Sequence, residues 1–244
     1  MQDVDILAML DKLQISFKSE CLRLQTDYPS WDAMTDERII VFSKMFNVIS
    51  STKIGFFFGV KYLNSSKWWE DHPAFEEDKG SSRSLEFTNY IKVSFIQALF
   101  SVNESAHRQF IRAIDPDACS GGTAPFENIY SSLIARITVE GKNEIKNSLD
   151  VWREIRNAIH NNMVYSHKSG RDKVIVYKGQ SLALDINKPL NFVQWKLLLS
   201  LTDDLRVILS TVVRSPELNS KESVFGPANF RLKNTMQEQF KEPS

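Results

Sequence analysis

Cysteine is scarce in this chain, because Cys21 and Cys119 are the two among 244 residues. Two cysteines cannot form a multi-disulfide scaffold, and no pair has the spacing of a zinc site. We therefore expect reduced thiols and no bound metal. Excess charge is also lacking, since 30 basic residues balance 30 acidic ones. A neutral chain does not coat nucleic acid or anionic membranes by bulk charge, although it can still carry a local basic site.

The sequence also lacks a long hydrophobic run. Its most apolar stretch, IGFFFGV at 54–60, is far shorter than the roughly 20 residues of a membrane-spanning helix. We interpret this stretch as a buried helix segment. The opening residues MQDVDILAML have no basic region before an apolar run, so no signal peptide is expected. These features predict a cytoplasmic protein with no membrane partner and no cofactor.

Hydrophobic periodicity, by contrast, is plentiful and typical of helices. Hydrophobic residues make up 42% of the chain and charged residues 25%, which is enough for a sizeable core. Residues 67–84 are polar and predict a long surface loop. Apolar residues recur every three or four positions in the segments that we predict to be helices: 2–26, 36–63, 85–100, 104–114, 124–139 (capped by Thr123), 142–161 and a long last helix after Pro189.

One short segment has the alternation of strands instead. Residues 174–177 (VIVY) are β-branched or aromatic, Lys178-Gly179-Gln180 has turn chemistry, and 181–186 can pair back. The predicted fold class is therefore all-α (mainly α): a helical bundle with a small β-hairpin, about 173–186, inserted before the last long helix. We expect one domain over 1–213. The polar segment 214–244, broken by proline and glycine, predicts an extended or disordered C-terminal tail.

The segment with the most chemistry is WREIRNAIHNN, residues 152–162. It ends a predicted helix whose apolar stripe comprises Ile145, Leu149, Trp152, Ile155 and Ile159. At about 100° per residue, Arg153, Arg156 and His160 share one flank of this stripe, with Asn157 beside them.

Two guanidinium groups and an imidazole at the rim of a core suit a phosphate ligand. Arginine binds phosphate through two parallel hydrogen bonds, and histidine transfers protons near neutral pH. From Lys142 to Lys178 there are eight Lys/Arg and four Asp/Glu, a local net charge of +4. Such an excess attracts anions to this part of the chain.

A purely structural interpretation competes with this one. Basic side chains near a helix C-terminus are favoured by the helix dipole, and asparagine commonly ends helices. Arg153 can also pair with Asp150 or Glu154. If the role is structural, Arg153 and His160 should be buried in local pairs, with no open cleft beside them.

WREIRNAIHNN followed by Tyr165 resembles the signature of the HEPN superfamily, in which an arginine and a polar residue precede a histidine near a helix end. HEPN proteins are helical bundles, and many are metal-independent endoribonucleases that act as toxins or in phage defence. Their active site usually forms where two copies of this helix meet in a homodimer. The resemblance makes Arg156 and Asn157 the arginine–polar pair and His160 the catalytic histidine.

The resemblance assigns Arg153 as an assisting residue or as the motif arginine itself. Further substrate contacts are expected from four residues that follow: Asn161, Asn162, Tyr165 and Lys168. The spacing departs from the common pattern, which has four to six residues between arginine and histidine. Three residues separate Arg156 from His160, and six separate Arg153 from His160, but Glu154 follows Arg153 where a polar neutral residue is usual.

Two functional hypotheses remain besides the structural one. The first is a HEPN-like homodimer that cleaves RNA, with an antitoxin or other protein partner. The second is a non-catalytic HEPN-like module that binds RNA, a nucleotide or a protein. The off-pattern spacing and the neutral overall charge favour the module, whereas the paired arginines, the histidine and the local net charge of +4 favour the nuclease.

Overall fold

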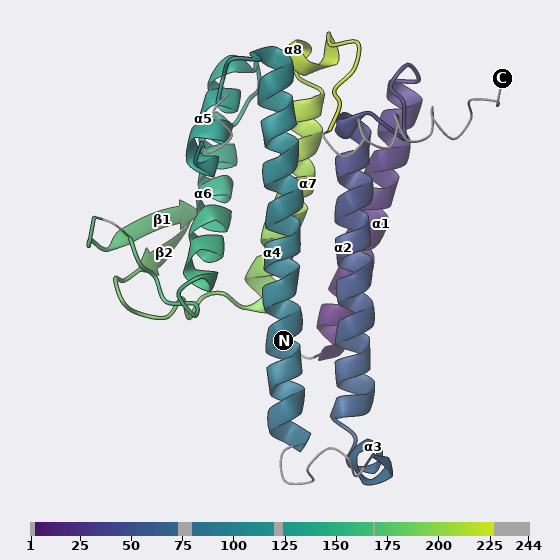
Figure 1. Ribbon diagram of the computed structural model, residues 1–244, viewed down its shortest axis with the longest axis vertical. Helices are drawn as coiled ribbons and strands as arrows, with labels where there is room; N and C mark the ends of the chain where they lie inside the picture. The colour runs from purple at the N-terminus through teal and green to yellow at the C-terminus, as the bar shows by residue number, and fades with distance from the viewer. Residues whose placement is uncertain (1–2, 73–79, 120–123, 168, 227–244) are drawn as a thin grey trace, which may run out of the picture.

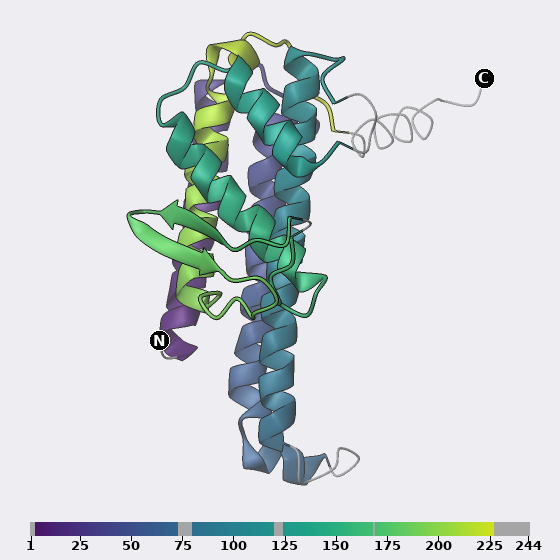
Figure 2. The same cartoon turned by 90° about the vertical axis from the view of Figure 1, so that its left-hand side faces the viewer.

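Four long helices lie side by side and form the body of the protein (Figures 1 and 2). The structure is a computed structural model that describes residues 3–72, 80–119, 124–167 and 169–226. The body consists of α1 (Asp3–Asp27), α2 (Glu37–Phe58), α4 (Gly80–Ile114) and α7 (Trp195–Val213). Its core is rich in phenylalanine, and the most deeply buried members are Phe17, Phe42, Phe56, Phe95 and Phe110. The predicted mainly α-helical fold class is confirmed.

The second helix shows how sequence chemistry sets a helix boundary. Asp36 caps α2 by accepting a hydrogen bond from the backbone N–H of Arg38 (3.0 Å). The helix continues as a π-helical turn, η1 (Gly59–Leu63), followed by α3 (Ser66–Asp71) within the predicted loop. A Cβ atom at Gly55 would lie 2.7 Å from Cδ1 of Ile91. Glycine thus lets α4 approach α2 closely at this position.

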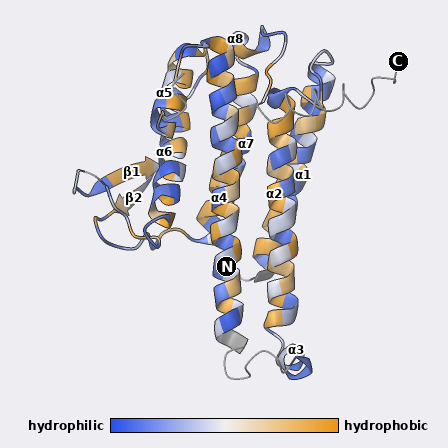
Figure 3. Ribbon diagram, viewed as in Figure 1, coloured by the Kyte–Doolittle hydropathy of each residue, from blue (hydrophilic) through white to orange (hydrophobic). Residues whose placement is uncertain are grey.

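The lower ends of α2 and α4 extend beyond the ends of α1 and α7 (Figure 1). Figure 3 shows hydrophobic residues along the length of α2. Within the described chain, one segment, Glu37–Leu63, is long and apolar enough to cross a membrane by length and composition alone, and 39% of its most apolar window is buried. The predicted burial of 54–60 is wrong in part, because Ile54, Phe57 and Phe58 are 59%, 43% and 52% exposed. A mostly buried core helix of a soluble protein also passes the membrane test, so the absence of a membrane partner stays a prediction.

The third and fourth predicted helices, 85–100 and 104–114, are one continuous helix. α4 spans 35 residues without interruption. The separation was wrong because the intervening Ser101, Val102 and Asn103 include neither glycine nor proline, and nothing in them breaks the backbone hydrogen bonds.

Two further helices and a hairpin lie against one side of this body (Figure 2). They are α5 (Phe126–Arg136), α6 (Lys142–Ile159), β1 (Lys173–Tyr177) and β2 (Gln180–Leu184). The strands pair antiparallel, with Lys173 opposite Leu184 and Tyr177 opposite Gln180. The two turn residues, Lys178 (φ 48°) and Gly179 (φ 76°), both have positive φ, as a tight hairpin turn requires. Thr123, the expected cap of α5, lies outside the described residues.

The chain beyond Arg214 differs from the expected tail. Residues Pro216–Asn219 form α8, and Leu218 is fully buried. Arg38, itself fully buried, donates hydrogen bonds to the carbonyls of Leu218 (2.8 Å) and Lys221 (2.9 Å). The domain therefore continues to about residue 226, because long-range contacts hold a segment whose composition alone suggests disorder. Residues 227–244 lie outside the described chain.

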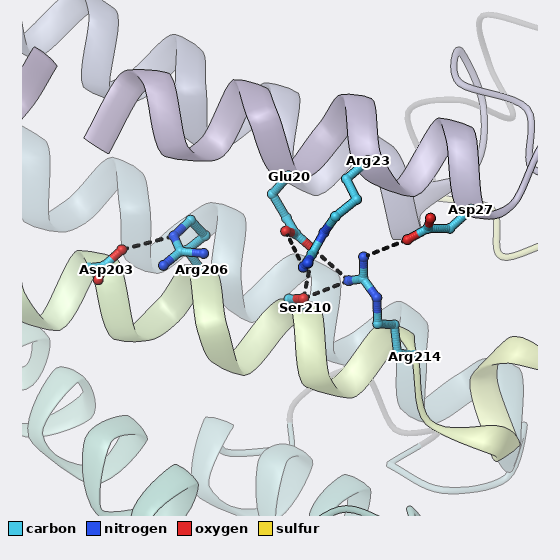
Figure 4. Close-up of polar contacts among 7 residues, drawn as sticks. All are labelled: Glu20, Arg23, Asp27, Asp203, Arg206, Ser210 and Arg214. Atoms are coloured by element: carbon cyan, nitrogen blue, oxygen red, sulfur yellow. Dashed lines mark hydrogen bonds and ion pairs between the residues drawn. The ribbon is translucent and has the colours of Figure 1, made fainter. Parts of the chain in front are cut away.

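A buried polar cluster joins the first helix to the last long one (Figure 4). Glu20 on α1 is 4% exposed and accepts hydrogen bonds from Ser210 on α7 (2.7 Å) and from Arg214, which directly follows α7. Burial alone would raise the pKa of Glu20, but these hydrogen bonds and the charges of Arg214 and Arg23 outweigh burial and lower the pKa. The carboxylate is thus held ionised between the two helices.

Candidate functional site at the C-terminal end of α6

The apolar stripe of α6 holds the candidate site in place. Ile145, Leu149, Trp152 and Ile155 are buried, as the stripe predicted, and Ile159 is partly buried. The indole N–H of Trp152 donates to the carbonyl of Leu201 on α7 (3.3 Å). The arginines lie on the flank of this stripe, where Arg153 contacts α5 and Arg156 contacts Phe100 on α4.

Arg153 is enclosed by acidic groups. Its side chain is 11% exposed and forms ion pairs with Glu127 on α5 and with its helix neighbours Asp150 (3.5 Å) and Glu154 (2.7 Å). It also donates a hydrogen bond to the hydroxyl of Tyr130 (3.2 Å). The expected pairing with Asp150 and Glu154 is confirmed, and the positive charge of Arg153 is offset inside the protein.

The groups around Arg153 form a network that shifts the pKa values of Tyr130 and Glu154. Burial raises the pKa of Tyr130 strongly, and its hydrogen bond to Asp150 adds to the rise, so the hydroxyl stays a donor. Burial would also raise the pKa of Glu154, but hydrogen bonds from Lys173 (2.9 Å) and Arg153 outweigh burial and lower it. This network ties α6 to α5 and β1, which is the arrangement that a structural role for Arg153 requires.

Arg156 is in a different environment. Its guanidinium lies over the ring of Phe100 on α4, 5.3 Å from the centroid, and donates to Oδ1 of Asn157 (3.3 Å). Within the described chain it forms no ion pair with a carboxylate. Arg156 and Asn157 both line a mainly polar pocket of about 350 Å³, which also includes Arg108 and His167. We call this the Arg156 pocket.

The charges of the other arginines in the Arg156 pocket are compensated. Arg108 on α4 pairs with Glu104 (2.6 Å) and donates to the carbonyl of Ala124 (2.9 Å). Arg153 is offset by the carboxylates described above. The three glutamates of the pocket lining are these partners, so the lining is neutral overall, and Arg156 is its one arginine without a carboxylate partner among the described residues. Its guanidinium can therefore still pair with an incoming anion.

His160 follows Arg156 by one helical turn and is exposed. It caps the end of α6 with helical backbone angles (φ −66°, ψ −15°), so its Cα–Cβ bond emerges on the same face as that of Arg156. It is not among the residues that line the Arg156 pocket. The structural interpretation predicted a buried His160 and no open cleft, and the structure differs on both points.

The other residues expected to contact substrate do not lie together on one surface. Asn161 and Asn162 are exposed beside His160, and Asn162 (φ 54°) and Met163 (φ 65°) end the helix in left-handed backbone. Tyr165 is 2% exposed and exchanges backbone hydrogen bonds with the 187–188 segment, so it belongs to the core. Lys168 lies outside the described residues.

Several residues of the site had no local signal in the sequence. Phe100 on α4 and Glu127 and Tyr130 on α5 come between 23 and 56 residues before the α6 residues that they contact. Arg108 on α4 lines the Arg156 pocket. Apolar and charged residues of these types are common in helices, so nothing in the sequence singled them out. His167, in contrast, follows the motif closely, and the structure brings it to the Arg156 pocket.

Two histidines lie outside the motif and do not line the Arg156 pocket. His72 is exposed, with its ring 2.7 Å from the carbonyl of Trp68, and His107 is fully buried in the core. In the described ranges, no three His, Cys, Asp or Glu side chains come together as a metal site.

The chain was also compared with known proteins. No protein-family model, no curated protein and no solved structure matches it. The HEPN resemblance of the motif helix therefore stays a hypothesis.

Proposed function

We propose that this protein is a HEPN-like, metal-independent endoribonuclease that acts as a homodimer. In this proposal Arg156 and Asn157 bind an RNA phosphate and His160 transfers protons. The observation that carries it is the contrast between two arginines of one helix. Arg153 is enclosed by carboxylates, whereas Arg156 has no carboxylate partner among the described residues and lines a polar pocket one turn from an exposed histidine.

RNA cleavage of this type needs a base, an acid and a cation beside the phosphate. The ribose 2′-oxygen attacks the adjacent phosphorus while a base removes its proton, and the 5′-oxygen leaves with a proton from an acid. The products are a 2′,3′-cyclic phosphate and a 5′-hydroxyl. Arg156 would stabilise the charge that develops on the phosphoryl oxygens. A dimer supplies two His160 imidazoles, one for each proton transfer.

The end of α6 is accessible for such a pairing. His160, Asn161 and Asn162 are all exposed at this end, so a second copy or an RNA strand can approach without unfolding the helix. We propose that Arg153 acts in this site as a positioning residue that holds α6 against α5 and β1. A cytoplasmic role as a toxin or in phage defence, with a protein partner that restrains the activity, belongs to the same proposal.

A non-catalytic RNA- or nucleotide-binding module is the second candidate. The observation that favours it is that His160 is not part of the pocket that Arg156 lines. In that case phosphate binds at Arg156 and no bond is broken.

Cleavage and binding assays on the same variants separate the two candidates. Labelled single-stranded RNA and tRNA are incubated with the protein in EDTA, and RNA binding is measured by fluorescence anisotropy. Arg156→Ala should lose both cleavage and binding, whereas His160→Ala should lose cleavage by about 10²-fold or more and keep binding. Arg206→Ala and His72→Ala, which change an arginine and a histidine elsewhere, serve as matched controls.

The outcomes distinguish all the hypotheses. Binding that requires Arg156, without cleavage by the folded wild type, supports the module. Cleavage that is unchanged in both Arg156→Ala and His160→Ala excludes this site. Absence of both cleavage and binding supports the purely structural interpretation.

A further inference from the structure

A second hollow lies near the N-terminal end of α6, opposite to the end that carries Arg156. It has a volume of about 500 Å³, within the usual range for small-molecule sites. Three elements enclose it: the first turns of α6 from Gly141 to Ser148, the hairpin turn from Val176 to Gly179, and the face of α7 from Asp204 to Thr211. We call it the α6–α7 groove.

The groove presents an apolar surface to solvent. Ile145 and Ile208 form buried parts of its wall, at 7% and 5% exposure, whereas Val176 and Val207 remain 52% and 49% exposed. The exposed valines come from different elements and face the same hollow. An apolar body placed there would remove both from water, which is the main source of affinity in such a site.

The charged groups of the groove are predominantly acidic. Its lining includes three carboxylates and one lysine. Asp204 is already satisfied, because it accepts a hydrogen bond from the hydroxyl of Tyr177 (2.6 Å) and pairs with Lys178 (2.7 Å). Glu140 and Glu144 are exposed at the mouth and form no ion pair within the part of the chain that the structure describes.

We propose that the α6–α7 groove binds a small organic cation with an apolar body and an amine. The apolar body packs on Ile145, Val207 and Ile208, and the ammonium group lies at Glu140 and Glu144. Charge complementarity selects this class, because the lining carries a net charge of −2 in a chain that is neutral overall. An anionic ligand of the same shape would meet like charge at the mouth.

Three probes of one shape test the proposal: 4-phenylbutylamine, 4-phenylbutanol and 4-phenylbutyrate. Binding is followed by ¹⁵N–¹H chemical shifts of the full-length protein, up to roughly 5 mM probe. The amine should bind best, about three- to tenfold more tightly than the alcohol, because two exposed carboxylates each contribute modestly. Glu144→Gln should weaken the amine by about two- to fivefold and leave the alcohol unchanged.

Filling the groove provides a second, independent readout. Val207→Trp should abolish binding of the amine, whereas Val174→Trp, at a valine that is 61% exposed and outside the groove lining, should have no effect. Neither variant changes the Arg156 pocket. No shifts at groove residues, equal binding of amine and alcohol, or unchanged amine binding by a folded Val207→Trp would each overturn the proposal.

Discussion

Replacement of Arg153 by alanine tests the claim that this arginine is structural and that Arg156 is not. The substitution removes the cation from between Glu154, which is 3% exposed, and Asp150, which is 15% exposed. Loss of one partner of a buried ion pair costs about 3–5 kcal/mol. Lys173 remains bound to Glu154 at 2.9 Å, and Glu127 is 52% exposed and returns to water at little cost. We therefore expect the lower end, about 3 kcal/mol.

Arg156→Ala is the matched control on the same helix. It loses the contact with the Phe100 ring, which contributes about 0.5–1 kcal/mol at a partly exposed position. Urea unfolding at pH 7, followed by circular dichroism, measures both variants. With an m-value of about 3 kcal/mol/M, the midpoint should fall by roughly 1 M for Arg153→Ala and by at most about 0.3 M for Arg156→Ala.

RNA cleavage and binding complete this test. Per folded molecule, Arg153→Ala should keep most of the binding, and Arg156→Ala should keep little. If Arg153→Ala unfolds like the wild type yet fails to bind or cleave RNA, Arg153 is a phosphate ligand and our reasoning from its ion pairs is wrong. Equal destabilisation by both substitutions would equally contradict the distinction between the two arginines.

Other buried polar groups give further expectations. Burial lowers the pKa of His107 to about 4, so the unfolded state takes up its proton first as pH falls. Between pH 6.5 and 4 the free energy of unfolding should therefore fall by about 3 kcal/mol more in the wild type than in His107→Leu. Urea unfolding at a series of pH values measures this difference. Arg38→Ala should cost about 3–5 kcal/mol and speed hydrogen exchange in 218–225; normal protection there would show that Arg38 does not hold this segment. Glu20→Gln should cost about 1–3 kcal/mol at pH 7. Because the pKa of Glu20 is lowered, this difference from the wild type should shrink below about pH 4.5, and a difference independent of pH would argue against an ionised Glu20.

Local patterns were sufficient for most of the secondary structure. Periodicity predicted α1, α2, α6 and α7, and turn chemistry at Lys178 and Gly179 predicted the hairpin. These features depend on residues within a few positions of one another, so a sequence carries them directly. The same approach divided α4 incorrectly because a gap in an apolar pattern does not by itself end a helix.

The candidate site depended on longer-range contacts. The motif WREIRNAIHNN indicated basic groups near a helix end, and its spacing placed Arg153, Arg156 and His160 on one flank. It could not indicate that Tyr130, 23 residues earlier, and Glu127 would enclose Arg153 and leave Arg156 as the available cation.

The sequence by itself thus determined most of the long helices, where the hairpin turns and which helix end is basic, because each follows from neighbouring residues. It did not predict α3 or α8. Only the tertiary structure decided which arginine is neutralised, that the 214–226 segment belongs to the domain, and that a second groove with an acidic mouth forms between α6 and α7. These properties depend on which distant side chains meet. The free energy of a charge is set by such neighbours and by its burial, and not by its place in the chain.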